Sequence, residues 1–238
     1  MVSLTISQKQ DFLNHMTDDQ STLIKKFKAR KTPYYTRSIG INELDDYIAE
    51  GWEEVSTSKH KAKIQKLKPE GVKLEDDIWC MFYNLGFRNL NYDEDLSVQW
   101  GDNPEDRHQL DVVAVGDEAI FVVECKATAK LKPASFKKEI GEICLYRDGV
   151  IKALRQIYGD EKKVKFIFAT RNYTFAEGCD DEKRLADNKI FQFTDNTYDY
   201  INSLIKSYKS TAIYQFYGLM FKHERINKEN SAQIFRIA

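Results

Sequence analysis

Residues 110–127 read LDVVAVGDEAIFVVECKA, and this stretch decides the fold. Two apolar runs, residues 110–115 and 119–127, are separated by the turn-like Gly116-Asp117-Glu118. Both faces of each run are mostly apolar, which is typical of strands that are buried on both sides. We therefore expect a hairpin in the middle of a sheet that helices cover.

Three ionisable residues interrupt this apolar hairpin: Asp111, Glu124 and Lys126. Side chains alternate along a strand, so Glu124 and Lys126 share a face while Cys125 points into the opposite layer. If a two-residue loop at 117–118 joins the strands, Asp111 lies directly opposite Glu124. Cross-strand partners have Cβ atoms about 5 Å apart. The sequence thus predicts two carboxylates and one ammonium at a single point of the sheet.

Such a pair of carboxylates is costly without a cation, because each disfavours ionisation of the other. Mg²⁺ removes the conflict, since it takes carboxylate oxygens together with water and phosphate oxygens. A bound divalent ion also activates water and stabilises charge on a phosphate. Lys126 could position the water and neutralise that charge. The alternative is a structural cluster of Asp111, Glu124 and Lys126, which predicts no metal binding.

The pattern Leu110-Asp111, twelve residues, then Glu124-Cys125-Lys126 resembles the signature of the PD-(D/E)xK nucleases. Leu110 stands where that signature has proline. The resemblance implies an α/β fold with a restriction-endonuclease-like αβββαβ core, that is, a mixed sheet flanked by helices. It also implies phosphodiester cleavage with Mg²⁺, for which Mn²⁺ can substitute. Asp111, Glu124 and the backbone carbonyl of Cys125 would be metal ligands, and Lys126 would be catalytic.

An acidic residue often lies on the first core helix of this family. Here residues 73–85 predict a helix that stops at Gly86, and Glu75 is its candidate for a catalytic and metal-binding role. The alternative is that Glu75, Asp76 and Asp77 simply favour the positive end of their helix.

Several polar residues near the motif are candidates for contact with nucleic acid. Gln109 would share a face with Asp111, and a group of lysines follows Lys126. That group is Lys130, Lys132, Lys137 and Lys138. Lysines at these positions can contact phosphates, although a solvated charged surface is the alternative.

The chain is expected to have three parts. Residues 1–68 form a small N-terminal appendage with a Lys-rich connector at 56–71, and residues 69–209 form the nuclease-like domain. Residues 210–238 form a C-terminal extension that would start a truncated further domain. Within the middle part, a helical region is expected over 133–158.

A narrower resemblance covers more of the chain. Glu50-Gly51-Trp52-Glu53, Leu74-Glu75-Asp76 and Tyr214-Gln215-Phe216 resemble the front portion of bacterial DGQHR-domain proteins, which are similar to a regulator of DNA phosphorothioation. The D-G-Q-H-R motif itself is absent. The resemblance implies a role in phage defence or DNA modification, with partner proteins from such a system.

Composition narrows the functional classes. The 238 residues carry a formal net charge of −1 and are 42% hydrophobic, as in an ordinary globular protein. The longest apolar run has five residues, far short of the roughly 20 that cross a bilayer, so we expect a cytoplasmic protein without membrane contact. The four cysteines show no disulfide or zinc pattern, and no histidine, His108 included, is expected to be catalytic.

These observations favour a metal-dependent DNA endonuclease. One alternative is a non-catalytic DNA-binding or regulatory module that keeps the nuclease-like fold, although such a module does not need a repulsive carboxylate pair. Another is an RNA-directed nuclease, because the metal chemistry does not read the sugar. A homodimer is expected on the ground that double-strand cleavage needs two active sites.

Overall fold

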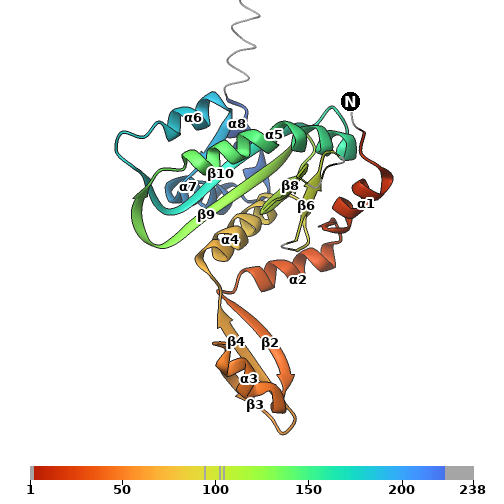
Figure 1. Cartoon of the computed structure of the whole chain (residues 1–238), viewed down its shortest axis with the longest axis vertical. Coiled ribbons are helices and arrows are strands. Elements are labelled where there is room, and N and C mark those ends of the chain that lie inside the picture. The colour runs from red at the N-terminus through yellow and green to blue at the C-terminus, as the bar shows by residue number, and fades with distance from the viewer. Residues whose placement is uncertain (1–2, 94, 102, 104, 223–238) are drawn as a thin grey trace, which may run out of the picture.

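The structure, a computed structural model, describes residues 3–93, 95–101, 103 and 105–222. A mixed six-stranded sheet with helices on both faces forms the main body, and a small three-stranded sheet projects from it (Figure 1). No described helix combines the length and apolarity that a membrane span requires. The expected α/β fold with a mixed sheet flanked by helices is confirmed.

The main sheet is antiparallel at one end and parallel at the other. In spatial order its strands are β1 (Met16–Thr17), β5 (Asn89–Asn91), β8 (Val112–Val115), β9 (Ala119–Ala134), β10 (Lys163–Phe175) and β11 (Ile190–Phe193). The strands from β1 to β9 pair antiparallel, whereas β10 runs parallel to both β9 and β11. The two strands of the expected hairpin, β8 and β9, therefore lie at the centre.

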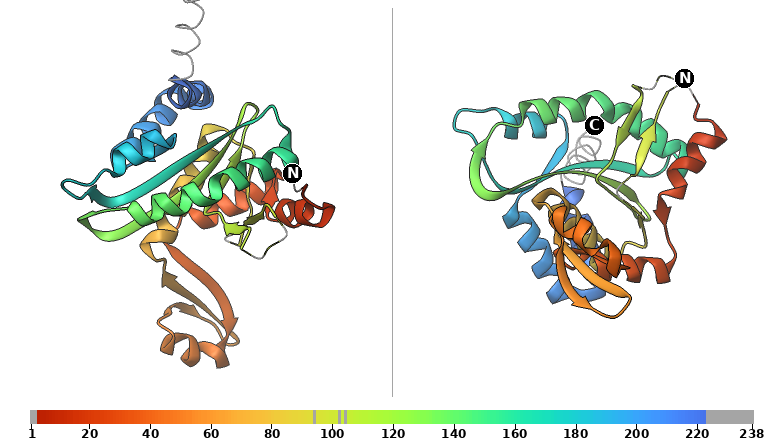
Figure 2. Two further views of the ribbon diagram at one scale, coloured as in Figure 1. Left: turned by 45° about the horizontal axis from the view of Figure 1, so that its top comes forward. Right: turned by 60° about the horizontal axis from the view of Figure 1, so that its bottom comes forward.

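Helices cover both faces of this sheet (Figure 2). One face packs against α2 (Gln20–Arg30), α4 (Glu70–Leu85), α7 (Asp195–Tyr208) and α8 (Ala212–Met220). The other face packs against α1 (Ile6–Asn14), α5 (Lys137–Tyr158), α6 (Asp181–Asp187) and a ribbon of β6 (Ser97–Gln99) and β7 (Arg107–Gln109). A short 3₁₀ turn, η2 (Lys209–Thr211), joins α7 to α8. The order α4, β5, β8, β9, α5, β10 follows the expected helix, three strands, helix, strand.

The alternation of side chains along β9 explains its apolar sequence. Phe121 and Val123 pack in the layer of α4, and Ile120 and Val122 pack in the layer of α5. A strand that is covered on both faces is apolar at consecutive positions rather than at alternate ones. Glu124 is the first residue of β9 to break this pattern.

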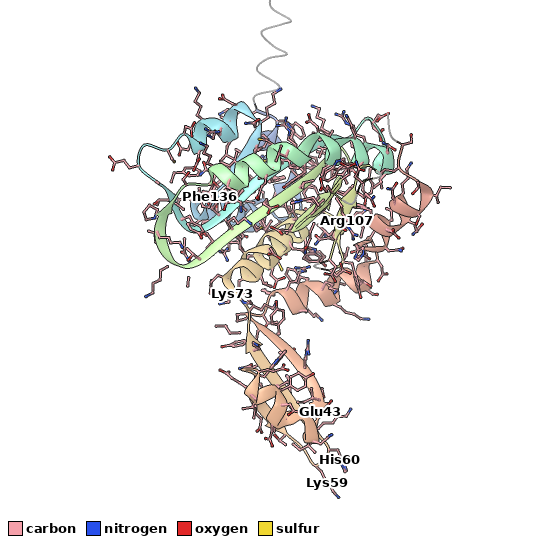
Figure 3. The ribbon with its side chains drawn as sticks, viewed as in Figure 1. Glu43, Lys59, His60, Lys73, Arg107 and Phe136 are labelled. Carbon is pink, nitrogen blue, oxygen red and sulfur yellow. The ribbon has the colours of Figure 1, made fainter. Side chains whose placement is uncertain are left out.

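The small sheet projects from the body beside α2 and α4. It contains β2 (Tyr34–Gly40), β3 (Glu53–Thr57) and β4 (Lys61–Leu67), with β4 in the middle, together with η1 (Ile41–Glu43) and α3 (Leu44–Ala49). Its own core consists of Ile39, Trp52, Ala62 and Ile64. Figure 3 shows Glu43, Lys59 and His60 in the part that lies away from the body.

The structure adds detail within the expected N-terminal part, residues 1–68. The Lys-rich connector at 56–71 contains the central strand β4, in which lysines alternate with the buried Ala62 and Ile64. Residues 6–30 belong to the body, because β1 pairs with β5 and α2 packs on α4. The projecting unit is thus residues 34–67, while the division of the chain at residue 68 stays a prediction. Residues 223–238 of the expected C-terminal extension lie outside the described residues.

The helix expected from Pro133 begins four residues later, at Lys137. Strand β9 continues through Ala134, and Pro133 pairs with Thr174 of β10. Proline is tolerated in a strand where its nitrogen faces an unpaired edge, and the β8–β9 ladder has ended by then.

Helix α8 is held by an aromatic cluster, which yields a stability prediction. The ring of Phe216 packs against those of Phe82 and Phe121, with centroids 5.7 and 5.1 Å away. Removing a fully buried phenylalanine ring costs about 3–5 kcal/mol, so Phe216→Ala is expected to lower the melting temperature by roughly 6 °C or more. Tyr214→Ala on the same helix, where the tyrosine is 72% exposed, should leave the melting temperature nearly unchanged. Equal melting temperatures for the two variants would contradict the packing.

Candidate active site

The register of the central hairpin places Asp111 opposite Glu124. Val112 pairs with Val123, and the Gly116 N–H donates to the Ala119 carbonyl at 2.8 Å, so the loop is the expected pair of residues at 117–118. Strand β8 begins one residue after Asp111, whereas β9 continues past Glu124. The predicted register is confirmed.

Asp111 is fixed at this strand end by two backbone contacts. Its Oδ2 accepts the Cys125 N–H at 2.7 Å, and its carbonyl accepts the Asn91 side-chain amide at 3.2 Å. The N–H and C=O of one strand residue face the same neighbouring strand, so the Cys125 carbonyl also faces the side on which Asp111 lies. The Cys125 side chain is buried in the layer of α4, as expected.

Glu124 is the centre of a polar cluster in the layer of α5. Its Oε1 lies 3.5 Å from Lys126 Nζ, so these two side chains share a face as predicted. Its Oε2 accepts the Tyr146 hydroxyl at 3.2 Å and lies 3.7 Å from His108 Nε2. Glu124 is thus held by one ammonium and one phenol, with an imidazole beside it.

Tyr146 is not among the residues that the sequence predicts at the site, and His108 lies closer to Glu124 than strand alternation predicts. If residues 108–111 formed one continuous strand, side chains would alternate between its faces, and His108 would lie on the face opposite to that of Asp111. In the structure β7 pairs with β6 and not with the main sheet, so the alternation does not carry across the break before β8. The His108 ring stacks on Tyr146 with centroids 3.7 Å apart. Tyr146 could have been predicted to face the sheet, because it follows Ile143 by three residues on the apolar face of a helix.

The surroundings of Asp111 change the pKa of its carboxyl group. Burial raises its pKa to about 7, the negative charges of Glu124 and Glu75 add to the rise, and the Cys125 N–H and Lys126 oppose it. Burial alone would lower the pKa of Lys126, but Glu124 and Asp111 outweigh it, so this pKa is raised and the ammonium stays charged. Once Asp111 ionises, two carboxylates with one ammonium leave an excess of negative charge.

Helix α4 begins at Glu70, so Glu75, Asp76 and Asp77 lie in its second turn, where they have different surroundings. Glu75 lies close enough to Asp111 for its charge to raise the pKa of that carboxyl, as its candidate role requires. Asp76 is buried with Arg30 and Lys68. Asp77 receives a 2.7 Å hydrogen bond from Arg171 of β10. The presence of acidic residues at positions 76 and 77 is therefore explained by their cationic partners rather than by the positive end of the helix.

The donor set fits a hard divalent cation with an open coordination sphere. Among the described residues no group of three or more histidine, cysteine, aspartate or glutamate side chains could hold a metal ion. Mg²⁺ does not need one, because it is usually held by one or two carboxylates and keeps several waters. Asp111 and Glu124 supply the carboxylates, and the Cys125 carbonyl is a third donor. A cation there would offset the burial and the repulsion that together raise the pKa of Asp111.

The candidate nucleic-acid contacts lie on either side of this cluster. Gln109 is exposed on β7, next to His108. Lys130 is exposed within a bulge of β9 at 128–131, opposite Asn172 of β10. The exposed Lys132 lies over the Tyr173 ring at 5.5 Å, and Lys137 and Lys138 are exposed at the start of α5. The lysines thus continue from Lys126 along one strand and into the next helix.

The raised pKa of Asp111 yields a pH-dependent stability prediction. Between its unfolded value of 3.8 and about 7 the folded protein binds the extra proton, so stability without divalent cations falls as the pH rises through this window. Asp111→Asn keeps an acceptor for Cys125 without the charge. In EDTA this variant should melt higher than the parent at pH 8, by about 2–4 °C per kcal/mol of repulsion removed. The difference should vanish near pH 4. A variant that melts lower at pH 8 would show that the carboxylate is not repelled.

Comparisons with known proteins give solved structures that align at low similarity, and two of them are described here. No family model and no curated protein matches the sequence. Can2 from Sulfobacillus thermosulfidooxidans, solved with cyclic tetra-adenylate, aligns with a TM-score of 0.35 and 16% identity over 83% of this chain and 53% of its own. Protein VC1899 from Vibrio cholerae aligns with a TM-score of 0.36 and 12% identity over 89% of this chain and 58% of its own. The chain thus spans little more than half the length of either protein, and neither alignment assigns it an activity or a ligand.

Proposed function

We propose that the protein is a Mg²⁺-dependent endonuclease that hydrolyses phosphodiester bonds in DNA, with Mn²⁺ able to replace Mg²⁺. One observation carries the proposal. Asp111 and Glu124 face each other across two central strands with Lys126 beside them, and burial together with the neighbouring carboxylates raises the pKa of Asp111 to about 7. This is an arrangement that a divalent cation and a phosphate stabilise.

The residues have distinct parts in the proposed reaction. Asp111, Glu124 and the Cys125 carbonyl would hold the cation, with Glu75 as a further candidate from α4. The cation would supply Lewis-acid stabilisation of the phosphate and activation of water. Lys126 stays protonated, so it donates hydrogen bonds to a phosphate oxygen or to the water, and does not act as a base.

The proposed chemistry is an in-line displacement. The oxygen of a water molecule bonds to phosphorus, the bond to the leaving oxygen breaks, and the water proton passes to solvent. The leaving oxygen takes up a proton in turn. Lys126, with its side chain 40% exposed, can reach a phosphate that approaches from solvent while Glu124 stays fixed by Tyr146.

The exposed polar residues support a nucleic-acid substrate. Lys130, Lys132, Lys137 and Lys138 are exposed and follow Lys126 in sequence, along β9 and into the start of α5, where they would form a cationic track. Such a track neutralises phosphates without reading sequence, and Gln109 would contact the strand on the other side. A role in defence or DNA modification, with partner proteins, rests on the resemblance to DGQHR-domain proteins. A homodimer follows if both strands of a duplex are cut.

Two further roles remain as outcomes of the test. A DNA-binding module without catalysis does not need two carboxylates that repel each other, and a structural ion cluster would balance its charges. When Asp111 is ionised, as above pH 7, the cluster of Asp111, Glu124 and Lys126 has an excess of negative charge, which favours the enzyme.

Cleavage of supercoiled plasmid tests the proposed activity. The parent protein should nick the plasmid with Mg²⁺ or Mn²⁺ and not in EDTA. Asp111→Asn and Lys126→Ala should each lower the rate by about 10²–10³-fold or more, since each removes a charge that acts on the reacting phosphate. Lys152→Ala, at an exposed position on α5, is the matched control and should keep the parent rate. Binding of the same plasmid is measured by mobility shift in Ca²⁺.

Three results would contradict the proposal in different ways. Cleavage that persists in both site variants would place the chemistry elsewhere. Absence of cleavage with DNA binding retained would favour the non-catalytic module. Absence of both metal binding and DNA binding would leave Asp111, Glu124 and Lys126 as a structural cluster.

Tyr146 is expected to position Glu124 for the metal. Burial, with the charge of Glu124 added to it, raises the pKa of Tyr146, so its hydroxyl stays a donor. Tyr146→Phe keeps the ring that stacks on His108 but frees Glu124 Oε2, and should weaken Mn²⁺ binding about 10-fold. Tyr158→Phe is the matched control on the same helix, about 18 Å further along its axis. Calorimetric titration with Mn²⁺ measures both, and equal affinities would rule out the positioning role.

A further inference from the structure

A cavity of about 790 Å³ lies where the small sheet joins the body. Its walls come from α2, from β2 and β4, and from the start of α4. Five cationic side chains and three carboxylates line it. The cations are Lys26, Arg30, Arg37, Lys66 and Lys68. The volume is that of a small-molecule site, and none of Asp111, Glu124 and Lys126 is part of its wall.

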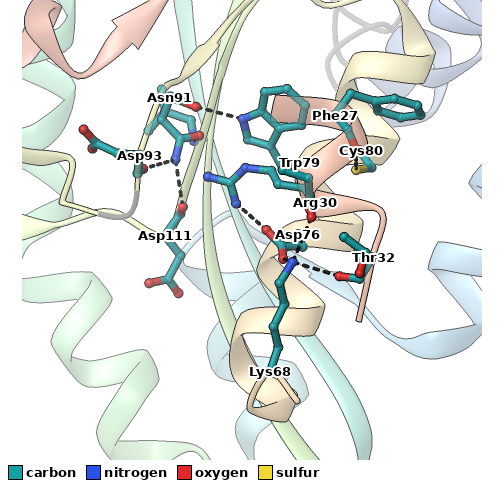
Figure 4. Close-up of polar contacts among 12 residues, drawn as sticks. Phe27, Arg30, Thr32, Lys68, Asp76, Trp79, Cys80, Asn91, Asp93 and Asp111 are labelled. Carbon is teal, nitrogen blue, oxygen red and sulfur yellow. Dashed lines mark hydrogen bonds and ion pairs between the residues drawn. The ribbon is translucent and has the colours of Figure 1, made fainter. Parts of the chain in front are cut away.

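A buried ion cluster forms the inner wall of this cavity (Figure 4). Asp76 is 3% exposed and lies between two cations: Arg30 Nη1 is 2.6 Å from Oδ1, and Lys68 Nζ is 2.8 Å from Oδ2. Arg30 and Lys68 are themselves 8% and 6% exposed. Two buried cations therefore share one buried carboxylate, and the cluster has a surplus positive charge.

The hydrogen bonds show which cation is incompletely satisfied. Lys68 Nζ donates to the carbonyls of Ala29 and Thr32 as well as to Asp76, which uses its three protons. Arg30 Nε is buried and has no hydrogen-bond partner among the residues that the structure describes. Buried polar groups normally find partners, and an unpaired donor on a buried guanidinium is costly. A purely structural cluster explains Asp76 but leaves this donor and this charge without a counterpart, whereas a bound anion supplies both.

The outer wall is aromatic. Tyr34 and Tyr35 line the cavity and are half-buried, and Trp52 lines it under the Arg37 guanidinium, 4.9 Å away. Flat aromatic side chains beside a cationic groove are what nucleobases stack on. The remaining carboxylates, Asp93 and Asp95, do not cancel the cationic side, because five cationic side chains face three carboxylates.

We propose that this cavity binds a nucleotide, with its phosphate at Arg30 and its base against Tyr35. The phosphate would take the unused donors of the guanidinium, a planar fork suited to phosphate oxygens. The same chemistry is present in a free mononucleotide and in one nucleotide of a nucleic-acid strand. The proposal does not rest on the nuclease activity, because no residue of the candidate active site contributes to the cavity.

Quenching of tryptophan fluorescence in the full chain tests the proposal. Trp52 lines the cavity, and Trp79 lies 5.3 Å from the Arg30 guanidinium, so occupancy should alter the emission. The probes are AMP, ribose 5-phosphate and a ten-residue oligothymidylate, each titrated in EDTA. Tyr35→Ala removes the stacking surface, and Arg30→Lys keeps a charge for Asp76 but loses the fork. Tyr200→Ala, at a tyrosine 53% exposed on α7, is the control, and thermal melts show that each variant is folded.

The proposal expects saturable binding of AMP, of the oligonucleotide or of both, weakened about 10-fold or more in Tyr35→Ala and Arg30→Lys and unchanged in Tyr200→Ala. Binding of AMP identifies a free nucleotide as the ligand, and binding of the oligonucleotide alone identifies a strand. Asp111→Asn should bind as the parent does, which separates this site from the nuclease proposal. The proposal is overturned if no probe binds, if folded Tyr35→Ala and Arg30→Lys bind like the parent, or if ribose 5-phosphate binds as tightly as AMP.

Discussion

The register between β8 and β9 is the constraint on which the candidate site depends. A two-residue loop aligns the strands so that Val112 meets Val123, and the ladder ends there. One residue further, Asp111 meets the edge of β9 and accepts the Cys125 N–H. Because side chains alternate, a slip of one residue would send Glu124 into the opposite layer and separate the two carboxylates. The apolar residues on both faces of the hairpin prevent that slip, since it would also exchange every core side chain.

Helices on both faces of the sheet contribute the charged and polar groups that surround Asp111 and Glu124. From α5, Tyr146 holds one oxygen of Glu124, and from α4, Glu75 adds negative charge near Asp111. The site is buried enough for these charges to raise the pKa of Asp111, while Lys126 stays partly exposed. Hydrophobic packing thus provides the free energy that keeps like charges together. That stored repulsion is what a cation would relieve.

The other charged centre of the molecule has the opposite sign. Asp76 joins α2, α4 and the end of β4 through Arg30 and Lys68, so the small sheet is anchored by ions and not by a continuous core. Replacing such a cluster with apolar residues often costs little stability, which points to a use for the charge itself. Adjacent acidic residues thus have opposite surroundings: Glu75 adds negative charge near Asp111, whereas Asp76 lies between two cations.

The sequence by itself determined the central hairpin, its register and the convergence of Asp111, Glu124 and Lys126, because loop length and strand alternation are local rules. It also indicated the mixed sheet with flanking helices through the order of its apolar segments. Only the tertiary structure brought His108 and Tyr146 to Glu124, since β7 leaves the main sheet and α5 packs back from far along the chain. The cavity at Arg30 also depends on the tertiary structure, because the segments that form its walls are distant in sequence. No local pattern determines which distant residues fold against each other.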